Sequence, residues 1–385
     1  MSCCGCIGAF QSGGKAMRVI QVLSGLHIGG VQSVVMSYYR HIDKTKVQFD
    51  FAIIDKDNGE YGEEVLRNGS RIFRVRDWSK DPLGFCKDFE AILKQNKDIT
   101  AVHAHMNYFG ALAAAVAKKC GIKNITVHAH SNYETKSFIK KVIRRAMRFI
   151  ILKDASAMLA CSAVAGEWLF GAKGVKSDRF CVLKNAIDYV PYFEALGMRD
   201  EYRSELGIAP GKKVLVNVSS VTPVKNQAFL VDLLAALNKD GKDLYRLVIV
   251  GDGVLRKQLE QQAESLGVSG QVVFCGWQTD TAKYLAAGDV FVFPSLFEGF
   301  SIVTLEAQAS GLDAVISDNV PDFAVVNERI VKKLELDIDK WKAYIEALPE
   351  KSPEQRLADC RESRTDEFDI NVCVKKLAEI YLREG

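Results

Sequence analysis

The sequence predicts an α/β protein made of two Rossmann-like, parallel, doubly wound domains that face a central cleft. Two observations predict this fold class. Short apolar runs rich in β-branched residues alternate with apolar-periodic helical stretches along almost the whole chain. A polar stretch at residues 189–210 interrupts this alternation, and we expect it to link the domains. The length of 385 residues suits two or three domains.

The composition is that of an ordinary soluble globular protein, with 48% hydrophobic and 26% charged residues. The net charge of +3 is too small to indicate a nucleic-acid partner, and we expect none. No apolar run approaches the roughly eighteen residues of a membrane span.

Residues 1–16 are expected to form a disordered extension, so that the folded chain begins at Met17. This stretch lacks the basic start, long apolar core and cleavage site of a secretory signal. Cys3, Cys4 and Cys6 could bind a metal or carry a lipid, but no second pair of ligands with zinc spacing accompanies them. The other cysteines are scattered like small buried hydrophobes, which indicates a reducing, cytoplasmic location.

The first domain is expected over residues 17–190. Its strands are predicted at 18–24, 49–54, 71–75, 100–104, 124–128, 157–161 and 180–183, and its helices at 31–41, 85–95, 110–120 and 136–153. Gly29 and Gly30 lie between the first strand and the first helix, where glycine lets a ligand approach the backbone. This turn is not the GxGxxG dinucleotide fingerprint.

Four of the six histidines form two HAH triplets, each at the end of a predicted strand: His103 with His105, and His128 with His130. Ligands of open α/β sheets bind outside the carboxyl ends of the strands. The two pairs could ligate a metal, but no Asp or Glu lies beside either pair to complete a site, so we expect no metal. A structural role is expected for His103 and His105, and a ligand contact for His128 or His130.

Residues 136–153 predict a basic amphipathic helix, because apolar residues recur at helical spacing with cations between them. The cations are Lys140, Lys141, Arg144, Arg145 and Arg148. Such a helix can present a solvated face or attach to an anionic membrane surface, and both interpretations stay open. Attachment would make the protein peripheral on the inner face of the cell membrane.

The second domain is expected over residues 191–368. Its strands are predicted at 213–218, 247–250, 272–274, 290–293 and 315–317, and its helices at 227–237, 255–266, 279–288 and 341–348, with a C-terminal helix at 369–382. Three loops at strand ends would meet in the cleft. They carry Lys225, the Gly251-Asp252-Gly253 turn, and Glu298 with Gly299.

The stretch at 290–312 is a strand, a glycine loop and a helix, with seven residues between Glu298 and Glu306. A helix N-terminus favours an anion, so a carboxylate there would sooner accept hydrogen bonds from hydroxyls than sit beside phosphate. Each glutamate alone could be an ordinary solvated residue. Together the three loops offer a cation for a diphosphate, backbone N–H groups at helix starts and a carboxylate for a ribose diol.

From about Arg18 to the C-terminus, the sequence resembles the retaining glycosyltransferases of family GT4, which have GT-B architecture and include bacterial capsular and exopolysaccharide enzymes. The segments that carry the resemblance are SGLHIGGVQSVVMSYYRHID, VHAHM, HAHSN, CSAVAGEWLFG, PVKNQ, VGDGVL and PSLFEGFSIVTLEAQASGL. The resemblance implies a hexose donor activated as a nucleotide diphosphate sugar, a lipid-linked or oligosaccharide acceptor, and no metal or other cofactor. It also implies that the C-terminal helix, residues 369–385, returns to the first domain.

The resemblance assigns the two-glutamate motif to Glu298, on the donor sugar, and Glu306, on the ribose hydroxyls. It places Lys225 on the diphosphate with Gly29 and Gly30 opposite, and His128 at the donor sugar. The complete expected donor site comprises Gly29, Gly30, His128, His130, Ser220, Lys225, Gly251, Glu298, Gly299, Phe300, Ser301 and Glu306.

The main departure from the family pattern is Ser219-Ser220, where Gly-Arg is usual; Asp313 also replaces a usual proline. Losing a phosphate-facing arginine costs about 1.5–3 kcal/mol, or roughly ten- to hundredfold in affinity. A catalytically weak or inactive relative that binds a nucleotide sugar or a partner is therefore the alternative. A GT-B-like epimerase or phosphorylase is a second one, but no phosphate cluster or cofactor lysine is evident.

Overall fold

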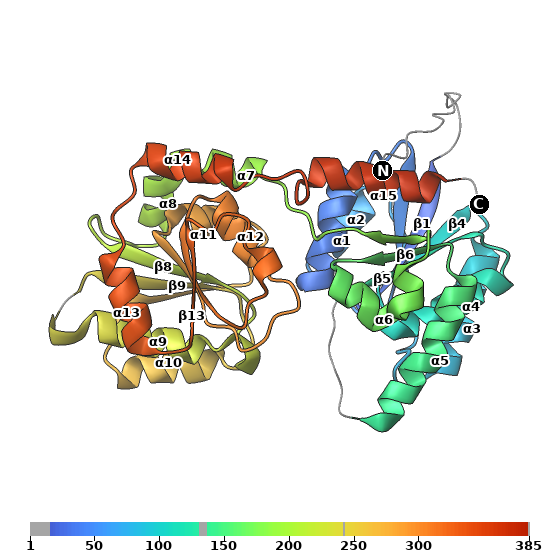
Figure 1. Cartoon of the computed structure of the whole chain (residues 1–385), viewed down its shortest axis with the longest axis horizontal. Coiled ribbons are helices and arrows are strands. Elements are labelled where there is room, and N and C mark those ends of the chain that lie inside the picture. Colours follow the sequence, from blue (N-terminus) through green and yellow to red (C-terminus); the bar gives the residue numbers. More distant parts are fainter. Residues whose placement is uncertain (1–15, 131–136, 242, 384–385) are drawn as a thin grey trace.

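The computed structural model describes residues 16–130, 137–241 and 243–383. The chain forms two lobes, each with one all-parallel β-sheet covered by helices (Figure 1). This confirms the predicted fold class. The expectations for the N-terminal extension and for Cys3, Cys4 and Cys6 lie outside the described residues. Within the described residues, no helix is long and apolar enough to cross a membrane.

The first sheet has the strand order β3-β2-β1-β4-β5-β6-β7. Its strands are β1 Met17–Leu23, β2 Val47–Ile53, β3 Ile72–Arg74, β4 Ile99–Ala104, β5 Asn124–Ala129, β6 Ala157–Ala160 and β7 Phe180–Val182. All seven residues of β2 are buried, as expected for a parallel sheet with helices on both faces. The helices are α1 Gly30–His41, α2 Gly62–Arg67, α3 Pro82–Gln95, α4 Gly110–Lys119, α5 Phe138–Asp154 and α6 Ala163–Val175.

The second sheet has the strand order β10-β9-β8-β11-β12-β13. Its strands are β8 Lys213–Val218, β9 Tyr245–Val250, β10 Val272–Gly276, β11 Val290–Phe293, β12 Asp313–Ser317 and β13 Val331–Leu334. The helices that follow them are α9 Gln227–Leu237, α10 Arg256–Ser265, α11 Ala282–Ala287, α12 Ile302–Ala309, α13 Ile338–Ala347 and α14 Pro353–Glu362.

Residues 189–210 do not form a free linker. They contain α7 Val190–Ala195 and α8 Arg199–Glu205, which pack against α11 of the second domain. Tyr192, Ala195 and Ile208 are buried in the apolar cluster of that domain. These few apolar residues give the polar stretch that was expected to link the domains one face buried against the second domain.

The last helix, α15 Ile370–Leu382, lies along the first domain although it follows α14 of the second (Figure 1). Its apolar face, including Leu377 and Tyr381, joins the cluster formed by β1, β2 and α1. The chain therefore crosses between the domains twice, and the C-terminus contributes to the core of the first domain.

Each sheet reverses its winding direction at one point, between β1 and β4 in the first and between β8 and β11 in the second. Loops at such switch points leave a crevice at the carboxyl ends of the strands, where ligands of doubly wound folds bind. Ile302, at the start of α12, packs on the apolar clusters of both domains. The switch-point loops of the second sheet therefore face the first domain.

Candidate active site

At the β8/β11 switch point, Lys225 and Glu298 are in direct contact. Lys225 Nζ lies 2.5 Å from Glu298 Oε1, and the two side chains are 21% and 10% exposed. The Ser295 hydroxyl donates to the same Glu298 oxygen at 2.6 Å. Two residues that are 73 positions apart in the sequence thus form one ion pair. This pair holds the lysine ammonium at the carboxyl ends of the strands of the second sheet.

Glu306 lies on α12, the helix that follows the Glu298 loop. The Thr281 hydroxyl donates to Glu306 Oε2 at 3.2 Å, and the Tyr192 hydroxyl hydrogen-bonds to Thr281 at 3.2 Å. Removal from water raises the pKa of Glu306, and the hydrogen bonds from Tyr192 and Thr281 oppose that shift. Tyr192 and Thr281 contact this candidate residue, and the sequence analysis missed them because no local pattern marks them.

The Gly251-Asp252-Gly253 turn packs against the Ser219-Ser220 loop. A Cβ on Gly251, where φ is +130°, would lie 2.0 Å from the Ser219 carbonyl oxygen. The two loops are also joined by backbone bonds from Ser219 N–H to Val250 O and from Val221 N–H to Asp252 O. Only glycine allows this approach. Gly251 therefore lets the two loops pack together, which brings Ser220 beside the turn.

Three helices begin directly after switch-point loops and have no side-chain cap on their first N–H groups: α1, α9 and α12. Gly29 precedes α1, and Gly30 is exposed with open space where a Cβ would be. Asn226 before α9 and Ser301 before α12 have left-handed backbones, with φ of 55° and 67°. Such strained residues cluster at functional sites, and the uncapped N–H groups can bind an anion.

Two of the expected donor-site residues are used in packing. Phe300 is 5% exposed and stacks on Phe323 with ring centroids 5.5 Å apart. Ser301 is buried, and its hydroxyl bonds to the Thr304 hydroxyl at 2.7 Å. Gly299 remains partly exposed between Glu298 and Phe300. At these positions, backbone groups rather than the side chains of Phe300 and Ser301 are available to a ligand.

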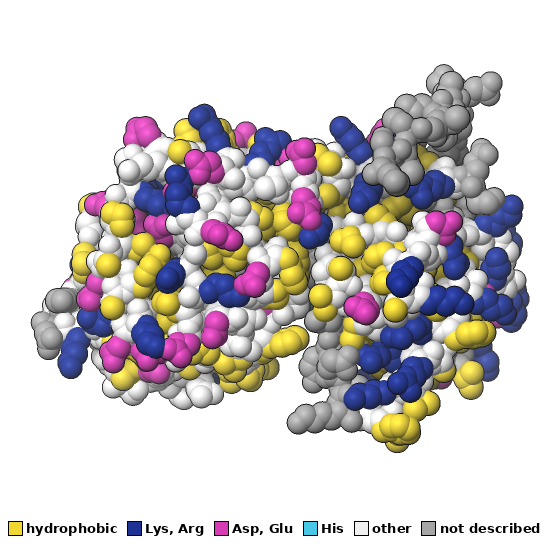
Figure 2. Space-filling model, viewed as in Figure 1, with side chains coloured by type: hydrophobic (Ala, Val, Ile, Leu, Met, Phe, Trp, Pro, Cys, Tyr) yellow, Lys and Arg dark blue, Asp and Glu magenta, His cyan; other side chains and the backbone are white. Residues whose placement is uncertain are grey.

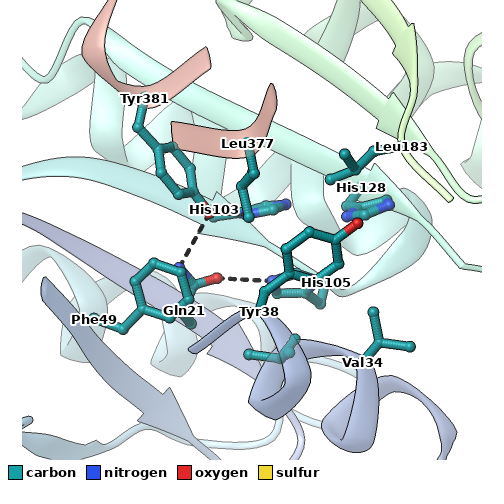
Figure 3. Close-up of a pocket in the computed structure, with 11 residues that line it drawn as sticks. Gln21, Val34, Tyr38, Phe49, His103, His105, His128, Leu183, Leu377 and Tyr381 are labelled. Carbon is teal, nitrogen blue, oxygen red and sulfur yellow. Dashed lines mark hydrogen bonds between the residues drawn. The ribbon is translucent and has the colours of Figure 1, made fainter. Parts of the chain in front are cut away.

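The two HAH triplets form one cluster at the ends of β4 and β5. His105 Nδ1 lies 2.7 Å from His130 Nε2, and the ring centroids of His103 and His128 are 5.3 Å apart. Gln21 and Tyr381 complete the cluster: His105 Nε2 lies 2.8 Å from Gln21 Oε1, and His103 Nδ1 lies 2.5 Å from Tyr381 Oη. Figure 3 shows Gln21, His103, His105 and His128 lying together beside Tyr381, which belongs to α15. The sequence could not pair His103 with Tyr381, which is 278 positions away.

The burial of these histidines makes stability depend on pH. Removal from water holds the pKa values of His103, His105 and His128 well below 6.5, and repulsion from neighbouring imidazoles adds a smaller shift in the same direction. Burial lowers the pKa of His130 to about 3. The unfolded chain therefore binds more protons below pH 6.5, and the free energy of unfolding falls as pH drops from 6.5 towards the folded-state values. Each neutral histidine contributes up to about 1.4 kcal/mol per pH unit.

This dependence can be measured by denaturant unfolding between pH 7.5 and pH 5. His130→Gln should make the free energy of unfolding less dependent on pH, by up to about 1.4 kcal/mol per pH unit, which corresponds to the uptake of one proton on unfolding. His27→Gln is the matched control, since His27 is an exposed histidine whose pKa is raised by Glu60 and Asp57 despite partial burial. An unchanged slope in His130→Gln would contradict the assignment of a neutral buried imidazole.

Comparison with known proteins agrees with this architecture. A family model described as "Glycosyltransferase Family 4" matches residues 28–189, and one described as "Glycosyl transferases group 1" matches residues 198–359. The chain is 35% identical to the "Putative glycosyltransferase EpsF" of Bacillus subtilis over 84% of this chain and 85% of that protein. It is 26% identical to the Escherichia coli "UDP-Gal:alpha-D-GlcNAc-diphosphoundecaprenol alpha-1,3-galactosyltransferase", over 92% and 94% of the two chains.

Solved structures show the same fold at lower identity. The Anabaena protein Alr3699/HepE, in complex with UDP and glucose, superposes with a TM-score of 0.75 at 17% identity and covers 94% of this chain and 98% of its own. WaaG, a glycosyltransferase involved in lipopolysaccharide biosynthesis, superposes with a TM-score of 0.67 at 18% identity over 94% and 99% of the chains.

Two doubly wound domains with their switch-point loops turned towards each other define this protein as a glycosyltransferase of GT-B architecture. Within that class, the chain belongs to glycosyltransferase family 4.

Proposed function

We propose that this glycosyltransferase moves a hexose, with retention, from a nucleotide diphosphate sugar to a lipid-linked or oligosaccharide acceptor in surface polysaccharide synthesis. The observation that carries the proposal is the Lys225–Glu298 pair at the β8/β11 switch point, whose Glu298 lies on the loop that leads into the helix of Glu306. A cation, a carboxylate and uncapped helix N-termini together suit a diphosphate joined to hydroxyl-bearing groups.

In the proposed mechanism, Lys225 and the N–H groups at the starts of α1 and α9 stabilise the charge that develops on the leaving diphosphate. Glu306 accepts hydrogen bonds from the ribose hydroxyls. Glu298 contacts the donor hexose, and His128 and His130 approach it from the first domain. The acceptor hydroxyl attacks the anomeric carbon from the face that the diphosphate leaves. The bond from that carbon to the diphosphate oxygen breaks, and the hydroxyl proton passes to the departing diphosphate. Positioning and charge stabilisation supply the rate enhancement, so transfer needs no metal at the diphosphate.

The relatives support the acceptor class. The Escherichia coli relative is named for transfer to a diphosphoundecaprenol-linked sugar, and a Staphylococcus aureus relative, CapH, is named for capsular polysaccharide biosynthesis; CapH is 22% identical over 95% of this chain. Both align with nearly the whole chain.

The proposal is tested by calorimetry with UDP, GDP and ADP, followed by a thermal-shift screen of the corresponding nucleotide sugars. One nucleotide should bind, and its hexose conjugates should raise the melting temperature further. If none of the three nucleotides binds, the donor site is wrongly assigned.

A catalytically weak or inactive relative is the second candidate, because Ser220 stands where the family usually has arginine. Ser220 lies beside the Gly251 turn, on the loop that leads to Lys225. We expect Ser220→Arg to tighten binding of the nucleotide diphosphate roughly ten- to hundredfold by adding a charge-assisted hydrogen bond. Turnover by Ser220→Arg beside a silent parent protein would favour this candidate, whereas transfer by the parent would remove it.

We further propose that α5 attaches the protein to an anionic membrane surface, which would place it on the inner face of the cell membrane. Ile151 is the one fully buried residue of this 17-residue helix, whereas Phe138 and Ile139 are 76% and 70% exposed. Lys140, Lys141 and Arg145 are exposed beside them, and basic and apolar side chains gather over this projecting helix (Figure 2). Exposed apolar residues favour an interfacial helix over a merely solvated one.

Two of the five expected cations have a different task. Arg148 donates to the carbonyls of Leu169 and Trp168 on α6, and Arg144 lies 4.8 Å from the Trp168 ring centroid. They hold α5 against α6, so the membrane contact would rest on Lys140, Lys141 and Arg145.

Sedimentation with vesicles at low salt tests this contact. Each basic residue near an anionic surface contributes about 1 kcal/mol, so Lys140→Gln/Lys141→Gln should weaken binding to phosphatidylserine-containing vesicles about thirtyfold. Lys239→Gln/Lys257→Gln, which changes two exposed lysines of the second domain, is the matched control. Equal sedimentation of wild type with neutral and anionic vesicles, or no sedimentation with either, would exclude the proposed surface.

A further inference from the structure

The histidine cluster has the composition of a metal site. One ring nitrogen from each of His103, His105 and His128 can be chosen so that all three atoms lie within 4.8 Å of one another. The rings come from the ends of two neighbouring strands, β4 and β5, so the sheet itself holds their backbones in place. His103 and His128 are each 2% exposed.

Several of these buried nitrogens have no hydrogen-bond partner. They are His103 Nε2, both ring nitrogens of His128, and His130 Nδ1. Leaving a buried polar atom unpaired costs about 1–3 kcal/mol, and native proteins rarely tolerate several at one place. The unpaired atoms therefore indicate that something absent from the protein chain satisfies them.

The opposite sides of two rings are already fixed by oxygen atoms. Tyr381 Oη lies 2.5 Å from His103 Nδ1, and Gln21 Oε1 lies 2.8 Å from His105 Nε2. Metal-binding histidines usually donate their second ring N–H to an oxygen in this way, which turns the lone pair of the other nitrogen towards the ion. Here that arrangement leaves His103 Nε2 and His105 Nδ1 as the atoms that present lone pairs.

We propose that His103, His105 and His128 bind one divalent transition-metal ion of the zinc class. Imidazole nitrogen is a ligand that Zn²⁺, Co²⁺, Ni²⁺ and Cu²⁺ accept, whereas Mg²⁺ and Ca²⁺ prefer oxygen. The three residues also line a cavity of about 10 Å³ together with Tyr38 and Leu377 (Figure 3). That is room for a single atom-sized guest.

Binding requires a small contraction of the cluster. Ligand atoms around a tetrahedral ion with bonds of about 2.0–2.1 Å lie about 3.3 Å apart, so each ring must move by less than about 1 Å. His105 Nδ1 must also release His130 Nε2, now 2.7 Å away; His130 then becomes the fourth ligand or leaves that position to water.

This ion would be separate from the transfer chemistry proposed above. It would lie in the first domain and join the ends of β4 and β5 to α15 through Tyr381, whereas Lys225 and Glu306 belong to the second domain. His128 is shared by the two proposals, because the proposed mechanism also places it at the donor hexose. Metal uptake and nucleotide binding can therefore be measured separately, because the nucleotide would bind to the second domain.

The test uses the full-length protein, stripped with a chelator and then dialysed against Zn²⁺ or Co²⁺. We expect about one equivalent of metal per chain, a cobalt d–d absorption typical of nitrogen ligands, and a higher melting temperature with zinc. A wild-type chain that takes up no metal would overturn the proposal, and a buried water would then satisfy the nitrogens.

Variants locate the site. His103→Gln/His128→Gln should lose the equivalent of metal and the zinc-dependent rise in melting temperature. Calorimetric binding of UDP then reports separately on the second domain of this variant. His27→Gln and His41→Gln are matched controls, since these histidines pair with carboxylates outside the cluster. Loss of the metal in either control, or its retention in His103→Gln/His128→Gln, would also overturn the proposal.

Discussion

Lys225→Ala is expected to lower kcat by about a hundred- to a thousandfold, the loss found when one preorganised group that stabilises transition-state charge is removed. The diphosphate gains negative charge as it leaves. The Lys225 ammonium lies at the β8/β11 switch point, where it would stabilise that charge. The substitution also frees Glu298, which keeps its 2.6 Å bond from Ser295. The loop should therefore stay in place while the positive charge is lost.

Steady-state transfer with the donor found in the nucleotide screen measures this effect. Lys340→Ala is the matched control, because Lys340 is an exposed lysine on α13 that pairs with Glu335. A loss confined to KM, with kcat unchanged, would show that Lys225 binds the substrate and transition state equally. A variant with wild-type kcat/KM would remove Lys225 from the site.

Glu306→Gln is expected to weaken nucleotide diphosphate binding about ten- to hundredfold, since hydrogen bonds to a charged acceptor contribute about 1.5–3 kcal/mol. The amide keeps the size of the side chain and one acceptor oxygen, so Thr281 can still donate to it. Affinity in the parent should also fall as pH is lowered through the pKa of Glu306, which burial raises above 4.5. The variant should lack that pH dependence.

Isothermal calorimetry with ribose and 2′,3′-dideoxyribose nucleotides measures the coupling. The dideoxy nucleotide should bind the wild-type protein and Glu306→Gln with equal affinity, because it lacks the ribose hydroxyls that donate hydrogen bonds to the carboxylate. Glu264→Gln, an exposed glutamate on α10, is the matched control. If the ratio of affinities for the ribose and dideoxyribose nucleotides is the same in the wild-type protein and in Glu306→Gln, the ribose binds elsewhere.

Much of the fold could be predicted from the sequence because the signals are local. Apolar runs and helical periodicity predicted both sheets, and the structure confirms the α/β class. Several elements were missed, among them β13 and α6. No residue of β13 is fully buried, and α6 contains Gly171 with φ of +69°, so neither has a clean period. Glu298 and Glu306 could be singled out by their spacing, since one loop and one helix carry both.

The remaining features of the site depend on contacts between distant segments. Sequence alone predicted the fold class, the strand-end positions of the histidines, and Lys225, Glu298 and Glu306 as candidate site residues. Only the tertiary structure decided that Lys225 pairs with Glu298, that Thr281 donates to Glu306, and that Tyr381 closes the histidine cluster. Periodicity records which face of a segment is buried, but not which segment covers it. That choice depends on the order of strands in the sheet and on the return of α15 to the first domain.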